Sequence, residues 1–261
     1  MSDIHPLLIE KYKQKRKGDG VSVRTINIEL SCLRHMFNMA IKWGKAQKNP
    51  MKEVKLFKEL EGKVRILSPE EEIRLLDAVR NSNRARHLEP VIITAIQTGM
   101  RNSEVLGLRW PNVDFVNRII TVEETKNGHI RKIPMTNKLI ETLQECKKKS
   151  HSEFVFENRM RKPYETFRTA WEYALKEAGI EGLTFHSLRH TFGTRLGMAG
   201  YDVSTIQELM GHRDLRMTMR YSHPTQEHKR NAVEAVNRVT TILTTETKTP
   251  EMGKVVNIGN R

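Results

Sequence analysis

The sequence predicts a mainly helical α+β protein with one small antiparallel β-sheet. Over most of its 261 residues, apolar side chains recur at the three- and four-residue spacing of amphipathic helices. Residues 119–123 and 129–133 have the pattern of short strands, and Asn127-Gly128 between them is a strong hairpin signal. The length is enough for one large domain or two smaller ones.

Residues 1–60 are predicted to form a small helical domain. A basic helix over residues 4–17 ends at Gly18, and a second helix begins at Ser22 or Thr25 and continues to Trp43. Helices of this number and size enclose a thin core. We therefore do not expect this domain to be complete by itself.

A charged connector at residues 55–65 leads into a larger domain, which we place at residues 64–240. Ser68 begins its first helix, with a proline and a glutamate at the positions typical of a helix start. Residues Ile73, Leu75 and Leu76 are expected on the buried side of that helix. The next helix, residues 89–99, is apolar enough to lie in the core. Further helices are predicted at residues 137–148, 164–179 and 225–240, and residues 241–261 are expected to be a flexible tail.

Three helices with tight connections are predicted between Thr184 and Tyr221. Thr184 caps the first, Asp202 caps the second, which ends at Gly211, and the third begins near Asp214 and carries Tyr221. This arrangement can bring together four polar side chains that lie apart in the sequence. They are His186, Arg189, His212 and Tyr221. His186 and Arg189 are expected on a helix face that does not need to be buried.

These residue types together indicate chemistry on a phosphodiester. A guanidinium matches two phosphate oxygens, a histidine donates hydrogen bonds or moves protons, and a tyrosine supplies a nucleophilic oxygen. Because the free phenol has a pKa of about 10, positive neighbours or a base must help it to ionise. Arg101 falls at the start of another helix, so its guanidinium and the free backbone amides there could also face an anion.

The charge of the chain points to the same class of partner. Lys and Arg number 45 against 31 acidic residues, which gives a net charge of +14 and a pI of about 9.8. Such an excess favours a polyanion, most commonly nucleic acid. We see no membrane-spanning run, membrane-surface segment or signal peptide, so we expect a cytoplasmic protein. The two cysteines form no pair motif and are expected to be reduced.

The ordered set of residues resembles the tyrosine recombinase (phage integrase) family. That family carries His-x-x-Arg, then Gly-His, then a tyrosine, and here these are His186 to Arg189, Gly211-His212 and Tyr221. Its first arginine motif is matched by Thr98-Gly99-Met100-Arg101, Glu104 and Leu108. Residues 21–27 resemble a helix of the family's core-binding domain, and residues 125–128 resemble its lysine hairpin. The resemblance covers nearly the whole chain to about residue 240. It implies a partial core-binding domain followed by a catalytic domain.

The resemblance implies that Arg101 and Arg189 clamp the non-bridging phosphate oxygens, with a hydrogen bond added by His212. Glu104, three residues after Arg101, would hold that arginine. His190 would stack or hydrogen-bond beneath the site.

Tyr221 would then attack phosphorus and form a 3′-phosphotyrosyl link, which needs neither a cofactor nor ATP. His186 would assist proton movement at the tyrosine, and Lys126 would protonate the departing 5′-oxygen. Lys132 is the rival for the lysine role, and Tyr201 is the alternative nucleophile.

The implied partner is double-stranded DNA, bound by a homotetramer on two synapsed duplexes and associated with the nucleoid. An accessory DNA-bending protein is a further candidate partner. The implied reaction is site-specific recombination that integrates or excises a mobile element. Two alternatives stay open: a type IB topoisomerase, which uses nearly the same chemistry, and a DNA-binding protein that does not cut. A metal site is not expected, since His186 and His190 lack a carboxylate or cysteine ligand at suitable spacing.

Overall fold

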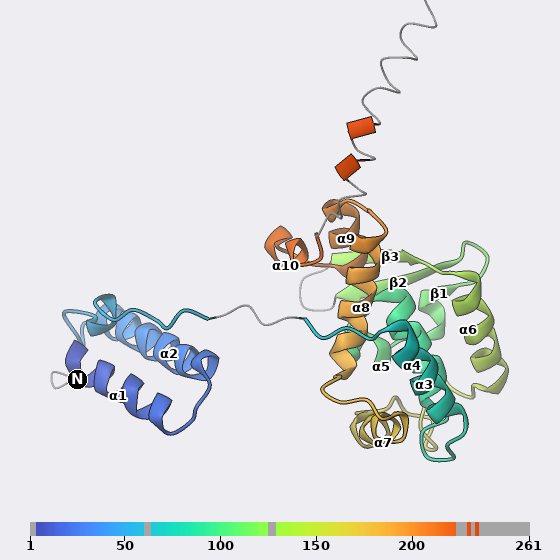
Figure 1. Ribbon diagram of the computed structural model, residues 1–261, viewed down its shortest axis with the longest axis horizontal. Helices are drawn as coiled ribbons and strands as arrows, with labels where there is room; N and C mark the ends of the chain where they lie inside the picture. The colour runs from blue at the N-terminus through green and yellow to red at the C-terminus, as the bar shows by residue number, and fades with distance from the viewer. Residues whose placement is uncertain (1–3, 60–63, 125–128, 223–228, 231–232, 235–261) are drawn as a thin grey trace, which may run out of the picture. The chain divides into compact units, whose positions relative to one another are not determined.

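The computed structural model describes residues 4–59, 64–124, 129–222, 229–230 and 233–234 of the chain (Figure 1). The chain divides into two compact units, residues 1–63 and 64–261. The described residues are mostly helical, with one three-stranded antiparallel sheet in the second unit. The predicted fold class, a mainly helical α+β protein, is confirmed.

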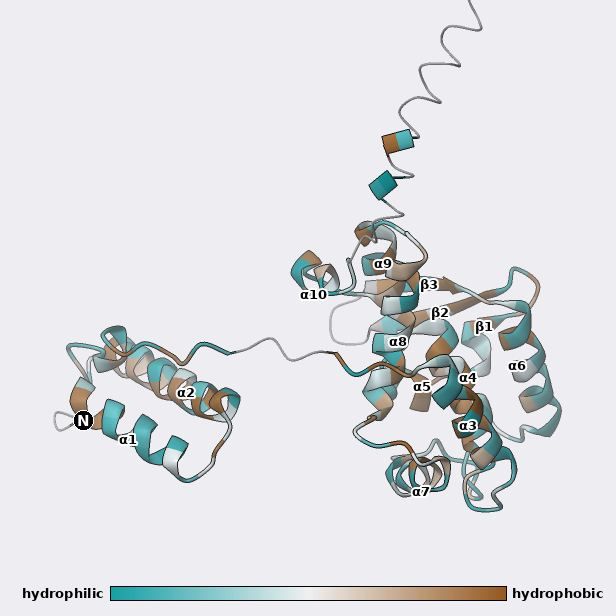
Figure 2. Cartoon of the chain, viewed as in Figure 1, coloured by the Kyte–Doolittle hydropathy of each residue, from teal (hydrophilic) through white to brown (hydrophobic). Residues whose placement is uncertain are grey.

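The first unit consists of α1 (Pro6–Gly18), α2 (Val23–Lys42) and a short 3-10 turn, η1 (Pro50–Lys52). Helix α1 begins two residues later than predicted because Pro6 opens its first turn and His5 caps it. Ser22 caps α2 by accepting a hydrogen bond from the backbone N–H of Thr25. Figure 2 shows that most residues of α1 are hydrophilic.

The core of this unit is small, as expected. Its buried apolar residues are Ile9, Ile26, Leu30, Met51 and Val54.

The second unit contains eight α-helices among its described residues. They are α3 (Pro69–Arg80), α4 (Leu88–Thr98), α5 (Asn102–Leu106), α6 (Asn137–Lys149), α7 (Arg168–Ala178), α8 (Phe185–Met198), α9 (Val203–Met210) and α10 (Leu215–Met219). A 3-10 turn, η2 (Trp110–Asn112), precedes the sheet. In Figure 1, α8 runs along the unit with α9 at one end and α7 at the other.

Helix α4 lies at the centre of the core, where it contacts α3, α6 and α8. Leu75 and Val79 of α3 are fully buried on the same side, one helical turn apart. Ile73, in contrast, is 61% exposed, so its predicted burial is wrong. Residues two apart on a helix point in nearly opposite directions, and burial of Leu75 therefore leaves Ile73 in solvent.

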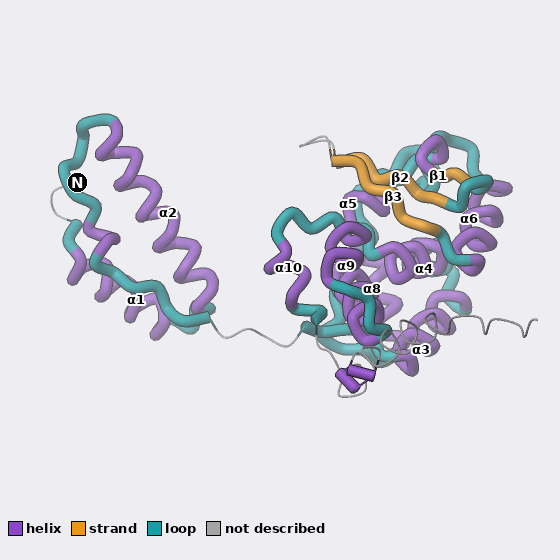
Figure 3. The backbone as a smooth tube through the Cα atoms, turned by 90° about the horizontal axis from the view of Figure 1, so that it is seen from above, coloured by secondary structure: helices purple, strands orange, loops and turns teal. Residues whose placement is uncertain are grey.

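The sheet consists of β1 (Val113–Asp114), β2 (Ile119–Glu124) and β3 (His129–Pro134), in that order (Figure 3). Strand β1 has only two residues and was not predicted. Strands β2 and β3 pair from Ile119 opposite Pro134 to Glu124 opposite His129. Residues 125–128, which include Lys126, lie outside the described part of the chain.

One further expectation differs in detail, and two others fall wholly or partly outside the described residues. The predicted helix at residues 164–179 begins only at Arg168, with Phe167 as its cap. The chain just before it is extended, since Pro163 forms an isolated β-bridge with Glu157. Of the predicted helix at residues 225–240, only residues 229–230 and 233–234 are described, as helix. The expected tail, residues 241–261, lies outside the description. Among the described helices, none combines the length and the apolar character needed to cross a membrane.

Candidate active site at the end of helix α9

Helix α8 starts at Thr184, whose side chain forms a reciprocal capping box with Ser187. One turn further, Arg189 is 3% exposed, so its predicted place on an exposed face is wrong. Its guanidinium donates hydrogen bonds to the carbonyls of Gly99 (2.6 Å) and Met210 (2.5 Å). A buried guanidinium needs such acceptors. Burial, and then the charge of Arg101, lowers the pKa of Arg189 to about 10.

Three arginine side chains bind at the carboxyl end of α9. Gly211, in the left-handed conformation, ends the helix. The carbonyls of residues 209, 210 and 211 accept hydrogen bonds from Arg131 (3.2 Å), Arg189 (2.5 Å) and Arg101 (2.8 Å), in that order. The last carbonyls of a helix have no partner inside it and carry partial negative charge, so they suit guanidinium groups. We call Arg101, Arg131 and Arg189 the arginine cluster.

Glu104 joins two members of this cluster. Its carboxylate accepts from the Arg101 guanidinium (2.8 Å), as expected from their spacing, and from two nitrogens of Arg131 (3.0 and 2.6 Å). Burial acts to raise the pKa of Glu104, but the hydrogen bonds and charge of Arg131 and the bonds from Arg101 outweigh it and hold that pKa at about 2. The carboxylate is therefore ionised at neutral pH.

Arg131 was not recognised as a site residue from the sequence. It lies two residues before the buried Ile133 on β3, so both side chains point to the same face of the sheet. Only 9% of the Arg131 side chain is exposed. A charged residue at an inward position of a strand is the signal that could have identified it.

His212 follows directly after the end of α9 and is buried. Its Nδ1 is 2.8 Å from the hydroxyl of Thr218 on α10. Its ring stacks on the ring of Tyr221, with centroids 6.2 Å apart and planes at 12°. Burial, followed by the charges of Arg189 and Arg101, lowers the pKa of His212 to about 4, so the ring is neutral at pH 7.

Tyr221 lies two residues beyond the end of α10, and its predicted place on that helix is wrong. The side chain packs against α8 and is only 4% exposed. Two glycines of α8 make room for it. A Cβ on Gly197 would overlap the Tyr221 carbonyl oxygen, and one on Gly193 would lie 3.1 Å from the Tyr221 ring. We call this place on α8 the tyrosine seat.

His190 also belongs to the tyrosine seat. Its Nδ1 lies 2.5 Å from the Tyr221 hydroxyl. His186, one turn earlier, meets the His190 ring edge-on with centroids 4.6 Å apart, and is itself exposed. Burial raises the pKa of Tyr221, and the charges of Arg189 and Arg220 oppose that rise.

The remaining candidate residues lie away from this site or outside the described ranges. Lys126 falls within the undescribed residues 125–128. Lys132 is exposed on β3, paired with Thr121. Tyr201 is 57% exposed in the turn after α8. Within the described ranges, no three His, Cys, Asp or Glu residues gather as a metal site would require.

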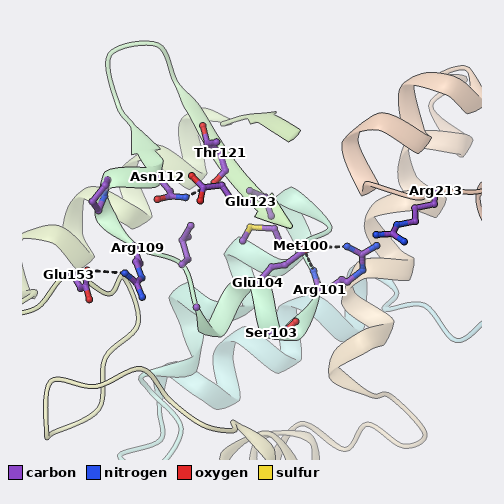
Figure 4. A pocket seen from close by; sticks show the side chains of 14 residues that line it. Met100, Arg101, Ser103, Glu104, Arg109, Asn112, Thr121, Glu123, Glu153 and Arg213 are labelled. Atoms are coloured by element: carbon purple, nitrogen blue, oxygen red, sulfur yellow. Dashed lines mark hydrogen bonds and ion pairs between the residues drawn. The ribbon is translucent and has the colours of Figure 1, made fainter. Parts of the chain in front are cut away.

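A groove of about 1030 Å³ opens beside the arginine cluster. Figure 4 shows Arg101 and Arg213 toward one end of it, and Asn112, Thr121 and Glu123 around β2 toward the other. Arg101 is thus the member of the cluster that a bound molecule could reach most directly, since 32% of its side chain is exposed.

Comparisons with known proteins identify the family of the chain. Residues 65–228 match the model of the phage integrase family, and residues 1–58 match the phage integrase N-terminal domain. The protein therefore belongs to the phage integrase family, as the sequence motifs predicted.

Three relatives illustrate the similarity. The shufflon-specific DNA recombinase of Escherichia coli is 33% identical over 210 residues, which are 80% of this chain and 53% of the relative. The chain thus spans about half the length of that protein. The Tn1549 transposon integrase, solved with circular intermediate DNA, superposes with a TM-score of 0.75 at 26% identity over 88% of this chain and 85% of the other. A lambda integrase tetramer bound to a Holliday junction shares the fold, with a TM-score of 0.69 at 22% identity over 85% and 65% of the two chains.

Proposed function

We propose that this protein is a site-specific DNA recombinase that cuts and rejoins DNA strands through a 3′-phosphotyrosyl intermediate. One observation carries the proposal. Two arginines, a histidine and a tyrosine, spread between positions 101 and 221, meet around the end of α9. A set of cations beside a phenol is suited to phosphoryl transfer, in which positioning and charge stabilisation supply most of the catalysis.

In this mechanism the hydroxyl of Tyr221 attacks the scissile phosphorus. Arg101 and Arg189 stabilise the negative charge that builds on the non-bridging oxygens, and His212 adds a hydrogen bond. The bond to the 5′-oxygen breaks, and that oxygen takes a proton from a lysine. We propose Lys126 for this role, with Lys132 as the alternative. Attack by a 5′-hydroxyl of a second duplex then reverses the chemistry and releases Tyr221.

Proton movement at the tyrosine is assigned to the histidines of α8. His186 lies on the exposed side and His190 touches the tyrosine hydroxyl. Glu104 holds the Arg101 guanidinium in place.

Arg189 and Tyr221 are only 3% and 4% exposed. The proposed reaction therefore requires DNA binding to open the site locally.

We further propose that the working form is a homotetramer on two duplexes, acting at the nucleoid in the cytoplasm with or without a DNA-bending partner. The net charge of +14 supports DNA as partner. Exchange between two duplexes requires four strand cuts, and hence four active sites. Recombination that integrates or excises a mobile element is preferred to type IB topoisomerase activity because the family N-terminal domain match covers residues 1–58. A DNA-binding protein without activity would have no use for a tyrosine among buried cations.

The test uses a nicked duplex selected from a random-sequence pool by binding to the wild-type chain. We expect the wild type to form a covalent protein–DNA adduct, and Tyr221→Phe to form none while its affinity for the duplex stays within about threefold, because the interface is largely ionic. Adducts that persist in Tyr221→Phe but vanish in Tyr201→Phe would move the nucleophile to Tyr201. No adduct with any variant, but retained binding, would favour a DNA-binding protein.

A further inference from the structure

The side chain in contact with the reactive oxygen is His190, not His186. Nδ1 of His190 lies 2.5 Å from the Tyr221 hydroxyl, whereas His186 reaches this pair only through the edge of the His190 ring. No hydrogen bond joins His186 to the tyrosine among the described residues. If proton transfer from the phenol follows the shortest contact, its first acceptor lies one helical turn beyond the family's His-x-x-Arg histidine.

We propose that His190 is a catalytic residue, the base that takes the proton of Tyr221 as the tyrosine attacks phosphorus. The inference rests on the proposed function, since it takes Tyr221 as the nucleophile. As the new bond between Oη and phosphorus forms, the Oη–H bond breaks and the proton moves to Nδ1 of His190, giving an imidazolium. When the 5′-hydroxyl attacks in the rejoining step, the tyrosine oxygen leaves and takes that proton back.

The surroundings of His190 keep its ring unprotonated. The ionisable groups that face it are His186 and Arg189 of α8, His212 after α9, and Arg220 and Tyr221 after α10. Burial, together with His186, Arg220 and Arg189, lowers the pKa of His190 to about 4. The ring is therefore neutral at pH 7, with an acceptor nitrogen for the phenol.

The tyrosine needs such help. Burial raises its pKa above the ordinary value of about 10, and the nearby arginines offset this only in part. A phenol in this state holds its proton at neutral pH, so an adjacent base is required for attack. Gly193 lets the ring lie close to α8, Gly197 does the same for the Tyr221 carbonyl, and His212 stacks on the ring, while the hydroxyl contacts His190.

The decisive variant is His190→Asn in the full chain. The asparagine amide can occupy the place of Nδ1 and keep a hydrogen bond to the phenol, but it cannot take up a proton near neutral pH. Adduct formation on the selected nicked duplex is measured between about pH 6 and about pH 9, with His190→Ala beside it. His87→Asn serves as the matched control, because His87 stacks on Tyr164 at the opposite end of α4 from Arg101.

We expect His190→Asn to cleave about 100-fold more slowly at pH 7, within the range for loss of a general base. Its rate should rise about tenfold per pH unit, because phenolate must form before attack. The wild type and His87→Asn should change less than about threefold over the same range. DNA affinity and the circular dichroism spectrum should match the wild type in every variant.

Two results would overturn the inference. If His190→Asn kept the wild-type rate and pH profile, His190 would only hold Tyr221 through a hydrogen bond and would not act as its base. Faster cleavage by His190→Ala would mean that the contact holds Tyr221 in a resting position. In both cases Tyr221→Phe would still be inactive, and the proposed function would stand. Adducts formed by Tyr221→Phe would instead remove the proposed nucleophile itself.

Discussion

The arginine cluster and the tyrosine seat lie side by side, yet they are held by different kinds of contact. Each arginine of the cluster donates to a carbonyl at the end of α9, and two of them share the Glu104 carboxylate. Tyr221, by contrast, has one side-chain hydrogen bond among the described residues, to His190, and otherwise packs against glycine surfaces of α8, the His212 ring, and Ile206 and Met210 of α9.

This difference shows which part of the site is preorganised. Several charge-assisted hydrogen bonds hold the cations before any substrate arrives, which is what stabilisation of transition-state charge requires. The tyrosine is held mainly by packing, and the helix before it, α10, is only five residues long with Leu215, Met217 and Met219 exposed. Fewer hydrogen bonds thus hold the tyrosine than hold the arginine cluster.

The largest expected effect follows from the buried member of the cluster. Arg189→Ala should lower the rate of adduct formation by about 1000-fold, the upper range for loss of one preorganised donor. Replacing the bridging 5′-oxygen by sulfur should not restore it, because charge on the non-bridging oxygens must be stabilised whichever atom leaves. Rates on both substrates are measured by adduct formation in single turnover.

Lys126→Ala provides the contrast on the same two substrates. A thiolate leaves without a proton, so sulfur should largely restore that variant. Rescue of Lys132→Ala instead would identify Lys132 as the acid. Rescue of Arg189→Ala would contradict its role in binding the non-bridging oxygens.

A second prediction concerns the carboxylate that links Arg101 with Arg131. The pKa of Glu104 is about 2 in the fold against 4.5 for the free side chain, so ionised Glu104 stabilises the fold. A depressed pKa gives stability that is present above about pH 4.5 and is lost as the pH falls toward 2. At about 1.4 kcal/mol per unit, the loss is about 3 kcal/mol.

Chemical denaturation of wild type and Glu104→Gln at a series of pH values measures this effect. Lowering the pH from about 5 to about 2.5 should reduce the free energy of unfolding of both proteins. The reduction should be about 2.5 kcal/mol smaller in the variant than in the wild type. Glu141→Gln, on the exposed face of α6, should follow the wild type within about 0.5 kcal/mol. Equal acid dependence in Glu104→Gln and wild type would show that the Arg101–Glu104–Arg131 linkage adds nothing to stability.

The parts of the site that depend on local sequence could be predicted. Thr184 and Asp202 cap their helices, and Glu104 holds Arg101, because each contact spans three residues. Burial of Arg189 could not be inferred, since its acceptors, the carbonyls of Gly99 and Met210, come from other helices.

The tyrosine seat shows the same limit. The spacing of Gly193 and Gly197 reveals a smooth strip on α8, but not that Tyr221 fills it, because that contact depends on how the chain turns after α10. Arg131 depends on the packing of the sheet against α5 and α9 in the same way. Sequence thus predicted most of the helices, the hairpin strands and the residue types of the site, while three-dimensional packing decides which of them touch.

The smallest expected effect tests whether shape alone seats the tyrosine. In Gly197→Ala the added methyl would overlap the Tyr221 carbonyl oxygen, which belongs to the backbone and cannot rotate away. The segment after α10 must shift, and since a small misplacement of a reacting group is costly, adduct formation should fall by about tenfold. The arginine cluster makes no contact with Gly197 in the described residues, so DNA affinity should be unchanged. Gly18→Ala, at the end of α1 with nothing within 4 Å of the new methyl, is the matched control and should keep the wild-type rate. Wild-type cleavage by Gly197→Ala would mean that Tyr221 reacts from another position, and the contrast between a fixed cluster and a shape-held nucleophile would have to be abandoned.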